Sequence, residues 1–299
     1  MTAGSGSNPT QTRLRLLREA RRILSVNALI VPSLPFAGQR VHCYHYHRWA
    51  QVRREGVPVL LGDDLVEARF IRRVNRFLAM VELEGCEEGV HVANSGRLRE
   101  LFLPGAPLWL KPAARPGRKT SYDLALVEAA GILVSADARL PNALVAEAAD
   151  AGALDGIGAP SAIVRESTFG ESRFDLMLEH ENGRQYVEVK SVTLVENGVG
   201  LFPDSPTLRG AKHLNTLTQA IQAGHRAAVV FVVQRADATS FAANEPADPA
   251  LAEALSRAIA AGVEAYAYNC RVTPSEVRLD RRLPIIPFES IPGEGVQRS

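Results

Sequence analysis

The 299-residue sequence has few of the features that mark secreted, membrane-bound or thiol-dependent proteins. Its three cysteines, Cys43, Cys86 and Cys270, are far apart and form no C-x-x-C pair, which argues against a disulfide framework and a thiolate zinc site. No apolar run approaches the ~18 residues that a membrane-spanning helix needs. The first residues contain no charged segment followed by an apolar one, so we expect no signal peptide, no membrane association and a cytoplasmic location.

Two further absences concern ligands. The sequence has no Gly-rich phosphate loop of the Walker or Rossmann type, which disfavours a sugar- or nucleotide-binding effector module. The histidines at 42, 45 and 47 beside Cys43 lack a suitably spaced fourth ligand, whereas closed zinc sites use four. We therefore expect residues 1–61 to be a basic, loosely ordered extension rather than a metal site.

The formal net charge of +1 is distributed unevenly along the chain. Residues 1–61 contain nine arginines and two glutamates and carry +7, residues 62–120 carry +2, and residues 121–299 carry −8. Positive segments attract polyanions, whereas negative segments repel them. Affinity for a phosphate backbone is therefore expected from the first 120 residues and from local basic patches in the remainder.

Residues 62–120 predict a small β-barrel. Stretches rich in β-branched and aromatic residues at 65–83, 89–94 and 107–111 are separated by turn signals. The basic side chains of this segment form a candidate nucleic-acid-binding groove, with a solvated charged surface as the alternative for each of them. These side chains are Arg69, Arg72, Arg73, Arg76, Arg97, Arg99, Lys111, Arg115, Arg118 and Lys119.

After a linker over 112–120, the periodicity predicts an α/β domain over 121–299. A helix, three strands, a helix, a strand, a helix and a strand follow one another, which is typical of a sheet with helices on its faces. The expected helices cover 123–130, 141–149, 208–223 and 249–261, with a short apolar piece at 132–135 and strands at 162–166, 227–233 and 264–271 around a central hairpin.

This central hairpin, Ser172–Lys190, carries the candidate catalytic groups. Asn182-Gly183 between two apolar runs is a strong signal for a two-residue β-turn. The register that it implies places Asp175 opposite Lys190. Alternation of side chains then puts Asp175, Glu188 and Lys190 on one face. The apolar residues of the hairpin share the other face, and they are Phe174, Leu176, Leu178, Val187 and Val189.

An Asp and a Glu that converge on one edge of a sheet, with no histidine or thiol near them, form a hard oxygen site of the kind that holds Mg²⁺. Lys190 can orient a metal-bound water or stabilise charge on a phosphoryl group, and this combination suits phosphodiester hydrolysis. The alternative is an Asp–Lys ion pair on an exposed sheet face. That alternative gives Glu188 no reason to lie within the apolar run Y-V-E-V.

Two helices supply further candidates. Thr207 is a suitable N-cap for a helix whose basic face could grip a phosphate backbone, with a solvated face as the alternative. That face consists of Arg209, Lys212 and His213. His213 could also act as a general base, which a metal site of this type does not require. Glu147 lies beside the core positions of helix 141–149 and is either a site residue or simply exposed.

These motifs resemble those of known families. The pattern Asp175-x12-Glu188-Val-Lys190, on the second and third strands of such a core, resembles the PD-(D/E)xK nuclease superfamily. Longer runs resemble the sugar fermentation stimulation protein family over residues 64–285. Among them are YVEVKSVTLVENGV from Tyr186, LFPDSPT from Leu201 and PNALVAE from Pro141.

The resemblance implies an OB-like barrel followed by a PD-(D/E)xK nuclease-like mixed sheet flanked by helices. By position it implies that Asp175 and Glu188 bind Mg²⁺ or Mn²⁺, that Lys190 is the catalytic amine and that Glu147 is the helix-borne acid. Residues 1–61 fall outside it.

The implied activity is DNA binding with a nuclease function, on DNA that we expect to be double-stranded and recognised without strong sequence preference. The family name implies a link to the regulation of sugar catabolism. A non-catalytic DNA-binding regulator that uses the nuclease fold as a scaffold is the alternative. The intact Asp/Glu/Lys set favours the nuclease, and a homodimer stays open.

Overall fold

The computed structural model describes residues 57–113 and 115–287. The chain divides into two compact units, Met1–Gln51 and Val52–Ser299, and all described residues belong to the second. Most of the expected basic extension, including its histidine cluster, therefore lies outside the described residues. The described part contains three sheets and three helices.

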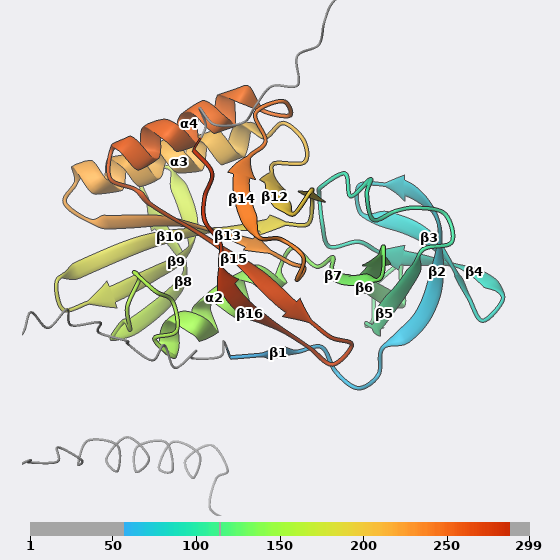
Figure 1. Ribbon diagram of the computed structural model, residues 1–299. Coiled ribbons are helices and arrows are strands. Elements are labelled where there is room, and N and C mark those ends of the chain that lie inside the picture. Colours follow the sequence, from blue (N-terminus) through green and yellow to red (C-terminus); the bar gives the residue numbers. More distant parts are fainter. Residues whose placement is uncertain (1–56, 114, 288–299) are drawn as a thin grey trace, which may run out of the picture. The chain divides into compact units, whose positions relative to one another are not determined.

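The six-stranded sheet contains a closed five-stranded barrel, as predicted (Figure 1). β4 pairs with β3 on one side and, in parallel, with β6 on the other, which closes the ring. β7 extends the sheet beyond β6. The strands are β2 (Val66–Asn75), β3 (Leu78–Leu83), β4 (Cys86–His91), β5 (Pro107–Pro112), β6 (Tyr122–Ala129) and β7 (Ile132–Ser135).

β6 replaces the helix predicted over 123–130, so that prediction is wrong. The strand is buried on both faces, because Leu124 and Val127 contribute to the barrel core while Ala125 and Leu126 contribute to the core of the second domain. A strand buried on both faces has a continuous apolar run, which cannot be distinguished from a buried helix by periodicity. The boundary predicted at residue 120 falls inside the barrel sheet, which extends to Ser135.

The second large sheet has seven strands in the order β1-β16-β15-β13-β10-β9-β8. β10, β13 and β15 are mutually parallel and the other pairs are antiparallel, so the sheet is mixed, as predicted. Its strands are β1 (Val59–Leu60), β8 (Ala162–Phe169), β9 (Ser172–His180), β10 (Gly183–Val192), β13 (Arg226–Val233), β15 (Glu264–Val272) and β16 (Glu276–Arg282). Because β1 pairs with β16, the end of the predicted extension belongs to this sheet.

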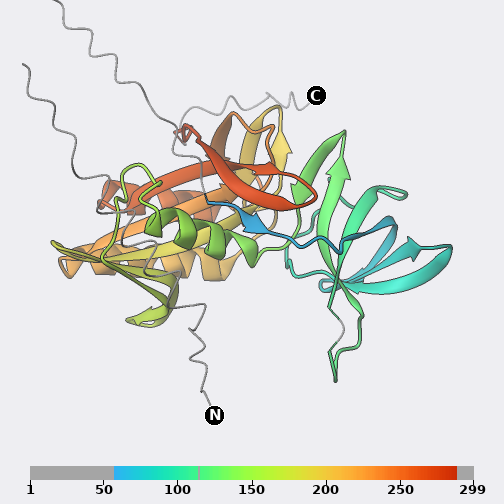
Figure 2. The same ribbon diagram turned by 90° about the horizontal axis from the view of Figure 1, so that it is seen from below.

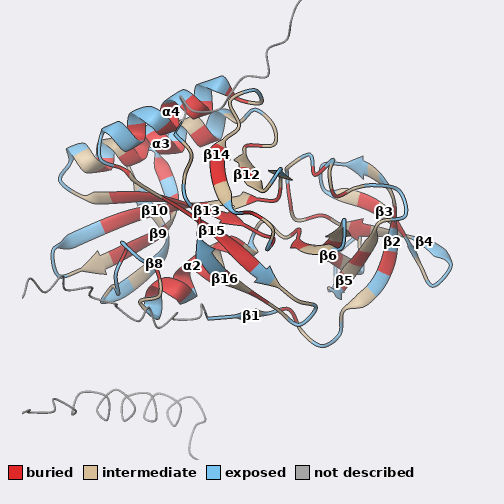
Figure 3. Cartoon of the chain, viewed as in Figure 1, coloured by how far each residue is buried: buried red, intermediate tan, exposed pale blue. Residues whose placement is uncertain are grey.

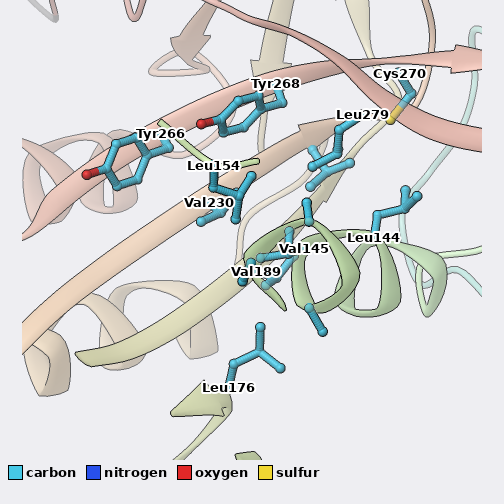
Figure 4. Close-up of a cluster of buried hydrophobic side chains, with 14 of the residues drawn as sticks. Leu144, Val145, Leu154, Leu176, Val189, Val230, Tyr266, Tyr268, Cys270 and Leu279 are labelled. Carbon is cyan, nitrogen blue, oxygen red and sulfur yellow. The ribbon is translucent and has the colours of Figure 1, made fainter. Parts of the chain in front are cut away.

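Helices cover both faces of the seven-stranded sheet (Figures 1 and 2). α2 (Leu140–Asp150) packs on one face through Leu144 and Val145, which belong to the cluster that also contains Val189 of β10 (Figure 4). α3 (Leu208–Gln222) and α4 (Pro249–Ala260) lie side by side on the other. The central strand β13 is buried from Ala227 onward (Figure 3). None of the described helices is long and apolar enough to cross a membrane.

Two strands of a small third sheet lie between β10 and α3 in the chain, and its last strand follows β13. This sheet consists of β11 (Val195–Glu196), β12 (Val199–Phe202) and β14 (Ser240–Ala243), in which β12 pairs with both neighbours. The loop 203–207 connects β12 to α3, and Thr207 caps the helix as predicted by accepting a hydrogen bond from the Gly210 N–H at 3.1 Å.

Gly210 lies where α3 contacts α4. A Cβ at this position would lie 2.5 Å from Leu251 Cδ1 and 2.9 Å from Thr207 Cγ2. Alanine is normally better than glycine inside a helix by about 1 kcal/mol. The close approach of the two helices therefore reverses the usual preference at this position.

We expect Gly210→Ala to lower the free energy of unfolding by about 1–3 kcal/mol, because the added methyl group overpacks against Leu251. The control Asn215→Ala, at an exposed position of α3, should change it by less than about 0.5 kcal/mol. Equilibrium denaturation measures both. A more stable Gly210→Ala protein would contradict the steric argument.

Candidate active site

β9 and β10 form the predicted hairpin, but in a different register. The turn consists of Glu181-Asn182, and Gly183, with a φ of 117°, pairs with His180. Asn182 does not have the positive φ that a turn at Asn182-Gly183 would need. A turn followed by a positive-φ glycine is another common hairpin connection, and it shifts the pairing by two residues.

The corrected register brings the two carboxylates together. The last pair between β9 and β10 is Leu176 with Val187, and Asp175 and Glu188 are the next residues on each strand. The predicted pairing of Asp175 with Lys190 is therefore wrong. Beyond the last pair, a side chain of β9 bonds to β10 in place of a main-chain carbonyl. Asp175 Oδ2 accepts a hydrogen bond from the Val189 N–H at 2.8 Å.

The prediction that five apolar residues of the hairpin share one face is wrong for one of them. Leu176, Leu178, Val187 and Val189 pack on the α2 side as a group, whereas Phe174 packs on the α3 side. On the neighbouring strand β8, Glu166 has a φ of 58° and lies between two residues that pair regularly with Leu176 and Phe174 of β9.

Asp175 is held from two directions. Its Oδ1 accepts a hydrogen bond from Asn142 Nδ2 of α2 at 2.7 Å, and its Oδ2 accepts the one from Val189. Burial raises the pKa of Asp175, and the charge of Glu188 raises it further, against the effect of these hydrogen bonds. An ionised Asp175 is therefore destabilised unless a cation lies beside it.

Glu188 is buried, with 4% of its surface exposed, and its two oxygens have different surroundings. Oε1 accepts hydrogen bonds from Lys190 Nζ, at 2.6 Å, and from His213 Nδ1 of α3. Oε2 has no hydrogen-bond partner. Burial acts to raise the pKa of Glu188, but the His213 hydrogen bond and the Lys190 charge outweigh it and lower the pKa. Glu188 is thus a buried carboxylate with one unpartnered oxygen.

His213 does not form part of a surface that could grip DNA. The side chain is buried, and its Nε2 accepts a hydrogen bond from Arg209 Nε at 3.3 Å while Nδ1 donates to Glu188. Lys212 forms an ion pair with Glu171 at 3.1 Å and does not line the cavity that contains Asp175 and Glu188. Of the predicted basic face of this helix, only Arg209 lines the cavity at the carboxylates.

The structure does not bring Glu147 into the site. Its side chain is half exposed and lies 4.0 Å from Arg165 of β8. Asn142 contacts Asp175 instead, five residues earlier on α2, which corresponds to about 140° around the helix axis. Sequence reasoning missed Asn142, although it belongs to the run PNALVAE and an acceptor-binding amide at the start of a helix was a visible signal.

The carboxylates line a cavity of about 620 Å³ that lies between the barrel and the seven-stranded sheet. Asp175, Glu188, Lys190 and Asn142 line one part of it, and Arg209 lines another. A second cavity, of about 800 Å³, runs along the barrel and shares five lining residues with the first. The shared residues are Arg76, Ser95, Gly96, Ser205 and Pro206. The two cavities therefore adjoin each other at these residues, and together they are called the groove.

Four of the predicted basic residues with free or partly free side chains line the barrel part of this groove, namely Arg72, Arg76, Arg97 and Arg99. Arg76 makes no ion pair within the described residues and lines both cavities. Arg72 forms an exposed ion pair with Glu87 at 2.5 Å. Arg69 and Lys111 are exposed but line neither cavity, so the structure does not bring these two into the groove.

Arg73 lines the groove, but its guanidinium is already engaged. It donates to five main-chain carbonyls at 2.6–3.2 Å, and its Cζ lies 5.1 Å from the centre of the Phe102 ring. The acceptors are in Asn75, Arg76, Asn94, Gly96 and Arg97. Burial lowers the pKa of Arg73. The side chain therefore orders the loop 94–97, and the prediction that Arg73 binds phosphate does not fit this geometry.

Asp204 fixes the same loop from the other side. Its Oδ2 accepts hydrogen bonds from the main-chain N–H groups of Arg97, at 2.5 Å, and Leu98, at 3.3 Å. A Cβ at Gly96 would lie 2.5 Å from this oxygen, so the approach requires glycine. This contact connects the loop before α3 to the barrel, and sequence reasoning missed it because nothing in the spacing pairs residues more than 100 positions apart.

Together, the fold and site define a protein that joins an OB-like barrel to a mixed sheet flanked by helices, with two acidic side chains and a lysine in the groove between them. The chain belongs to the sugar fermentation stimulation protein family. The family model "SfsA N-terminal OB domain" matches residues 71–136, and the model "Sugar fermentation stimulation protein RE domain" matches residues 139–276.

Named relatives agree with this assignment. The sugar fermentation stimulation protein homologs of Desulforamulus reducens and Moorella thermoacetica are each 46% identical, over 74% of this chain and 92% and 96% of theirs. The solved structure of Pyrococcus furiosus SfsA in complex with Ca²⁺ is similar, with 31% identity and a TM-score of 0.70. That match covers 78% of this chain and 99% of the Pyrococcus chain.

We expect Asp175→Asn to raise the melting temperature in metal-free buffer at neutral pH. The substitution removes a buried charge that Glu188 repels. The amide oxygen of the variant can still accept from the Val189 N–H, and its NH2 group can donate to Asn142 Oδ1 once the Asn142 amide is flipped. Because the pKa of Asp175 is raised in the folded state, wild type loses stability as pH rises through that pKa. The advantage of Asp175→Asn should therefore shrink as the pH is lowered through the same range.

Thermal unfolding over a pH series measures this effect, and Glu147→Gln is the matched control, since its carboxylate is exposed and outside the site. A destabilised Asp175→Asn protein at neutral pH would show that the carboxylate is not electrostatically strained.

Proposed function

We propose that this protein hydrolyses phosphodiester bonds in double-stranded DNA with the help of Mg²⁺ or Mn²⁺. The observation that carries the proposal is that the two cavities of the groove adjoin each other through five shared lining residues. Arginines of the barrel line one part, and Asp175, Glu188 and Lys190 line the other. A polyanion bound along the arginines would thus extend to the acidic site.

The residues at the site fit a divalent cation. Glu188 Oε2 is buried and unpartnered, and the raised pKa of Asp175 shows that Lys190 and the hydrogen bonds compensate its buried charge only in part. No group of three or more His, Cys, Asp or Glu side chains suited to a metal occurs within residues 57–113 and 115–287. Two carboxylates are nevertheless sufficient for Mg²⁺, which usually retains water and binds substrate phosphate as well. The Ca²⁺ complex of the Pyrococcus relative is consistent with hard oxygen ligands.

Asp175 and Glu188 would hold the cation, which supplies charge neutralisation at the phosphate and a more acidic bound water. Lys190 Nζ, 2.6 Å from Glu188 Oε1, is placed to stabilise negative charge that develops on the phosphoryl oxygens. Asn142 orients Asp175, and His213 orients Glu188 so that Oε2 stays available. These two residues position the ligands of the cation rather than act on the substrate.

DNA binding would depend mainly on phosphate contacts. Arg72, Arg76, Arg97 and Arg99 line the barrel part of the groove, and Arg209 lines the acidic part. Contacts of arginine with phosphate position a duplex but carry no sequence information, which favours binding without strong sequence preference. An effect on sugar catabolism, to which the family name refers, would then act through DNA.

A second candidate is a DNA-binding regulator without catalysis. The arginine-lined cavity on the barrel favours it, because none of Asp175, Glu188 and Lys190 lines that cavity. Binding by the barrel could thus occur without chemistry.

We expect wild type to nick supercoiled plasmid in the presence of Mg²⁺ or Mn²⁺, and Asp175→Ala and Lys190→Ala to lose at least about 100-fold in rate, because each removes a group that stabilises the transition state. Glu147→Ala should nick as fast as wild type, since this residue lies outside the site. Binding without nicking in all four proteins would favour the regulator.

We expect DNA affinity to fall steeply with salt concentration. Arg76→Ala should weaken binding and reduce the slope of log affinity against log salt by about 1, because one phosphate contact is lost. Arg69→Ala is the control, since Arg69 is exposed on β2, the strand that ends just before Arg76, but lines neither cavity. Fluorescence anisotropy across a salt series distinguishes them. Equal effects of the two substitutions would argue against the groove.

A further inference from the structure

A third cavity, of about 690 Å³, lies on the barrel apart from the acidic site. Apolar and aromatic side chains line one part of it, and cationic side chains line the other. Its lining residues are Asn75, Phe77, Leu78, Gly89, His91, Arg118, Lys119, Thr120 and Arg139. Asn75 also lines the arginine-rich cavity, so the two meet at the turn between β2 and β3.

Phe77 lies at this turn and is 49% exposed, which is unusual for a large aromatic side chain. Its ring centre is 6.4 Å from that of His91, at an interplanar angle of 32°. The main chain beneath the ring is fixed, since the Phe77 N–H donates to Asn75 Oδ1 at 2.9 Å and the Phe77 carbonyl accepts from the Val92 N–H at 3.0 Å. The main chain that carries the exposed ring is therefore held in place.

The cationic part of the cavity is only partly neutralised. Arg118 and Arg139 both pair with Asp123, and Arg139 also pairs with Asp137 at 2.6 Å. Lys119 is exposed and makes no ion pair with the residues that the structure describes. Three cations thus face two carboxylates, which leaves positive charge beside the aromatic surface.

We propose that this cavity binds single-stranded DNA, with an unpaired base stacked on Phe77 beside His91 and the backbone phosphate near Lys119. An exposed ring face is useful for an unstacked base, because the faces of bases inside a duplex are covered by their neighbours. The strands that line the cavity also favour single-stranded DNA, since OB barrels bind oligonucleotides on their second and third strands and the adjoining loops. Here these are β3, β4, the β2–β3 turn and the loop before β6.

The inference deepens the proposed function and rests on it for the identity of the polymer as DNA. Because the two barrel cavities meet at Asn75, a strand that leaves a duplex in the arginine-rich cavity would reach Phe77 around the β2–β3 turn. The preferred substrate would then be DNA that has a single-stranded segment next to a duplex.

The test measures binding of a labelled oligothymidylate of about 15 nucleotides, and of a duplex of equal length, by the full chain and its variants. Phe77→Ala should weaken binding of the single strand by about 5- to 100-fold, as expected for the loss of one stacked base, and leave duplex binding within about twofold. Phe77→Tyr, which keeps the ring, should bind as wild type does. Leu103→Ala, which removes an exposed apolar side chain outside the cavity, should also bind normally.

An equal loss of single-strand and duplex binding in Phe77→Ala would overturn the inference, as would unchanged single-strand binding or a Tyr variant as weak as the Ala variant. Duplex nicking with Mg²⁺ is measured on the same proteins. Failure of wild type to nick would overturn the proposed hydrolysis and leave the stacking site standing. Failure of wild type to bind the single strand would overturn the stacking site and leave the proposed hydrolysis of duplex DNA standing.

Discussion

The energetic constraint behind the site is the burial of two neighbouring carboxylates. Glu188 is almost fully buried and Asp175 is partly buried, and the repulsion between them is offset only in part by hydrogen bonds and by Lys190. Buried charges of this kind persist only where surrounding groups are organised to hold them. The groups that do so come from α2, β10 and α3, so the site depends on a sheet with helices on both of its faces.

The barrel and the sheet form one groove because a single loop is held from two directions. Arg73 binds the carbonyls of the loop from within the barrel, and Asp204 binds its N–H groups from the segment before α3. Both interactions use the main chain, so they fix the path of the loop whatever side chains it carries. The arginines at 97 and 99 are thereby free to line the groove.

Much of the architecture could be predicted from sequence, and the failures have physical causes. Strong periodicity and caps located α2, α3 and α4 within a residue or two, and the Asn-Gly pair located the hairpin. The helix predicted over 123–130 failed because tertiary pairing overrode local propensity in a segment buried on both sides.

The candidate site, too, was predicted from sequence in part. The spacing of Asp175, Glu188 and Lys190 on adjacent strands was enough to predict their proximity. The choice of Glu147 over Asn142 depended on the rotation of one helix, which a sequence motif does not specify. Arg73 and His213 are residue types that often bind ligands. Their hydrogen bonds show that Arg73 instead holds a loop of the barrel and that His213 holds the Glu188 side chain.

The pairing of β1 with β16 has a consequence for movement. The chain enters the seven-stranded sheet at β1, leaves it to form the barrel and returns at α2, so the barrel is an insertion between two parts of one domain. The connections, 61–65 and 136–139, are short. A domain tethered at both ends has far less freedom to swing than one on a single linker. The two connections therefore limit how far the barrel can move relative to the sheet, and with it how far the distance between the arginines and the carboxylates can change when a polymer binds.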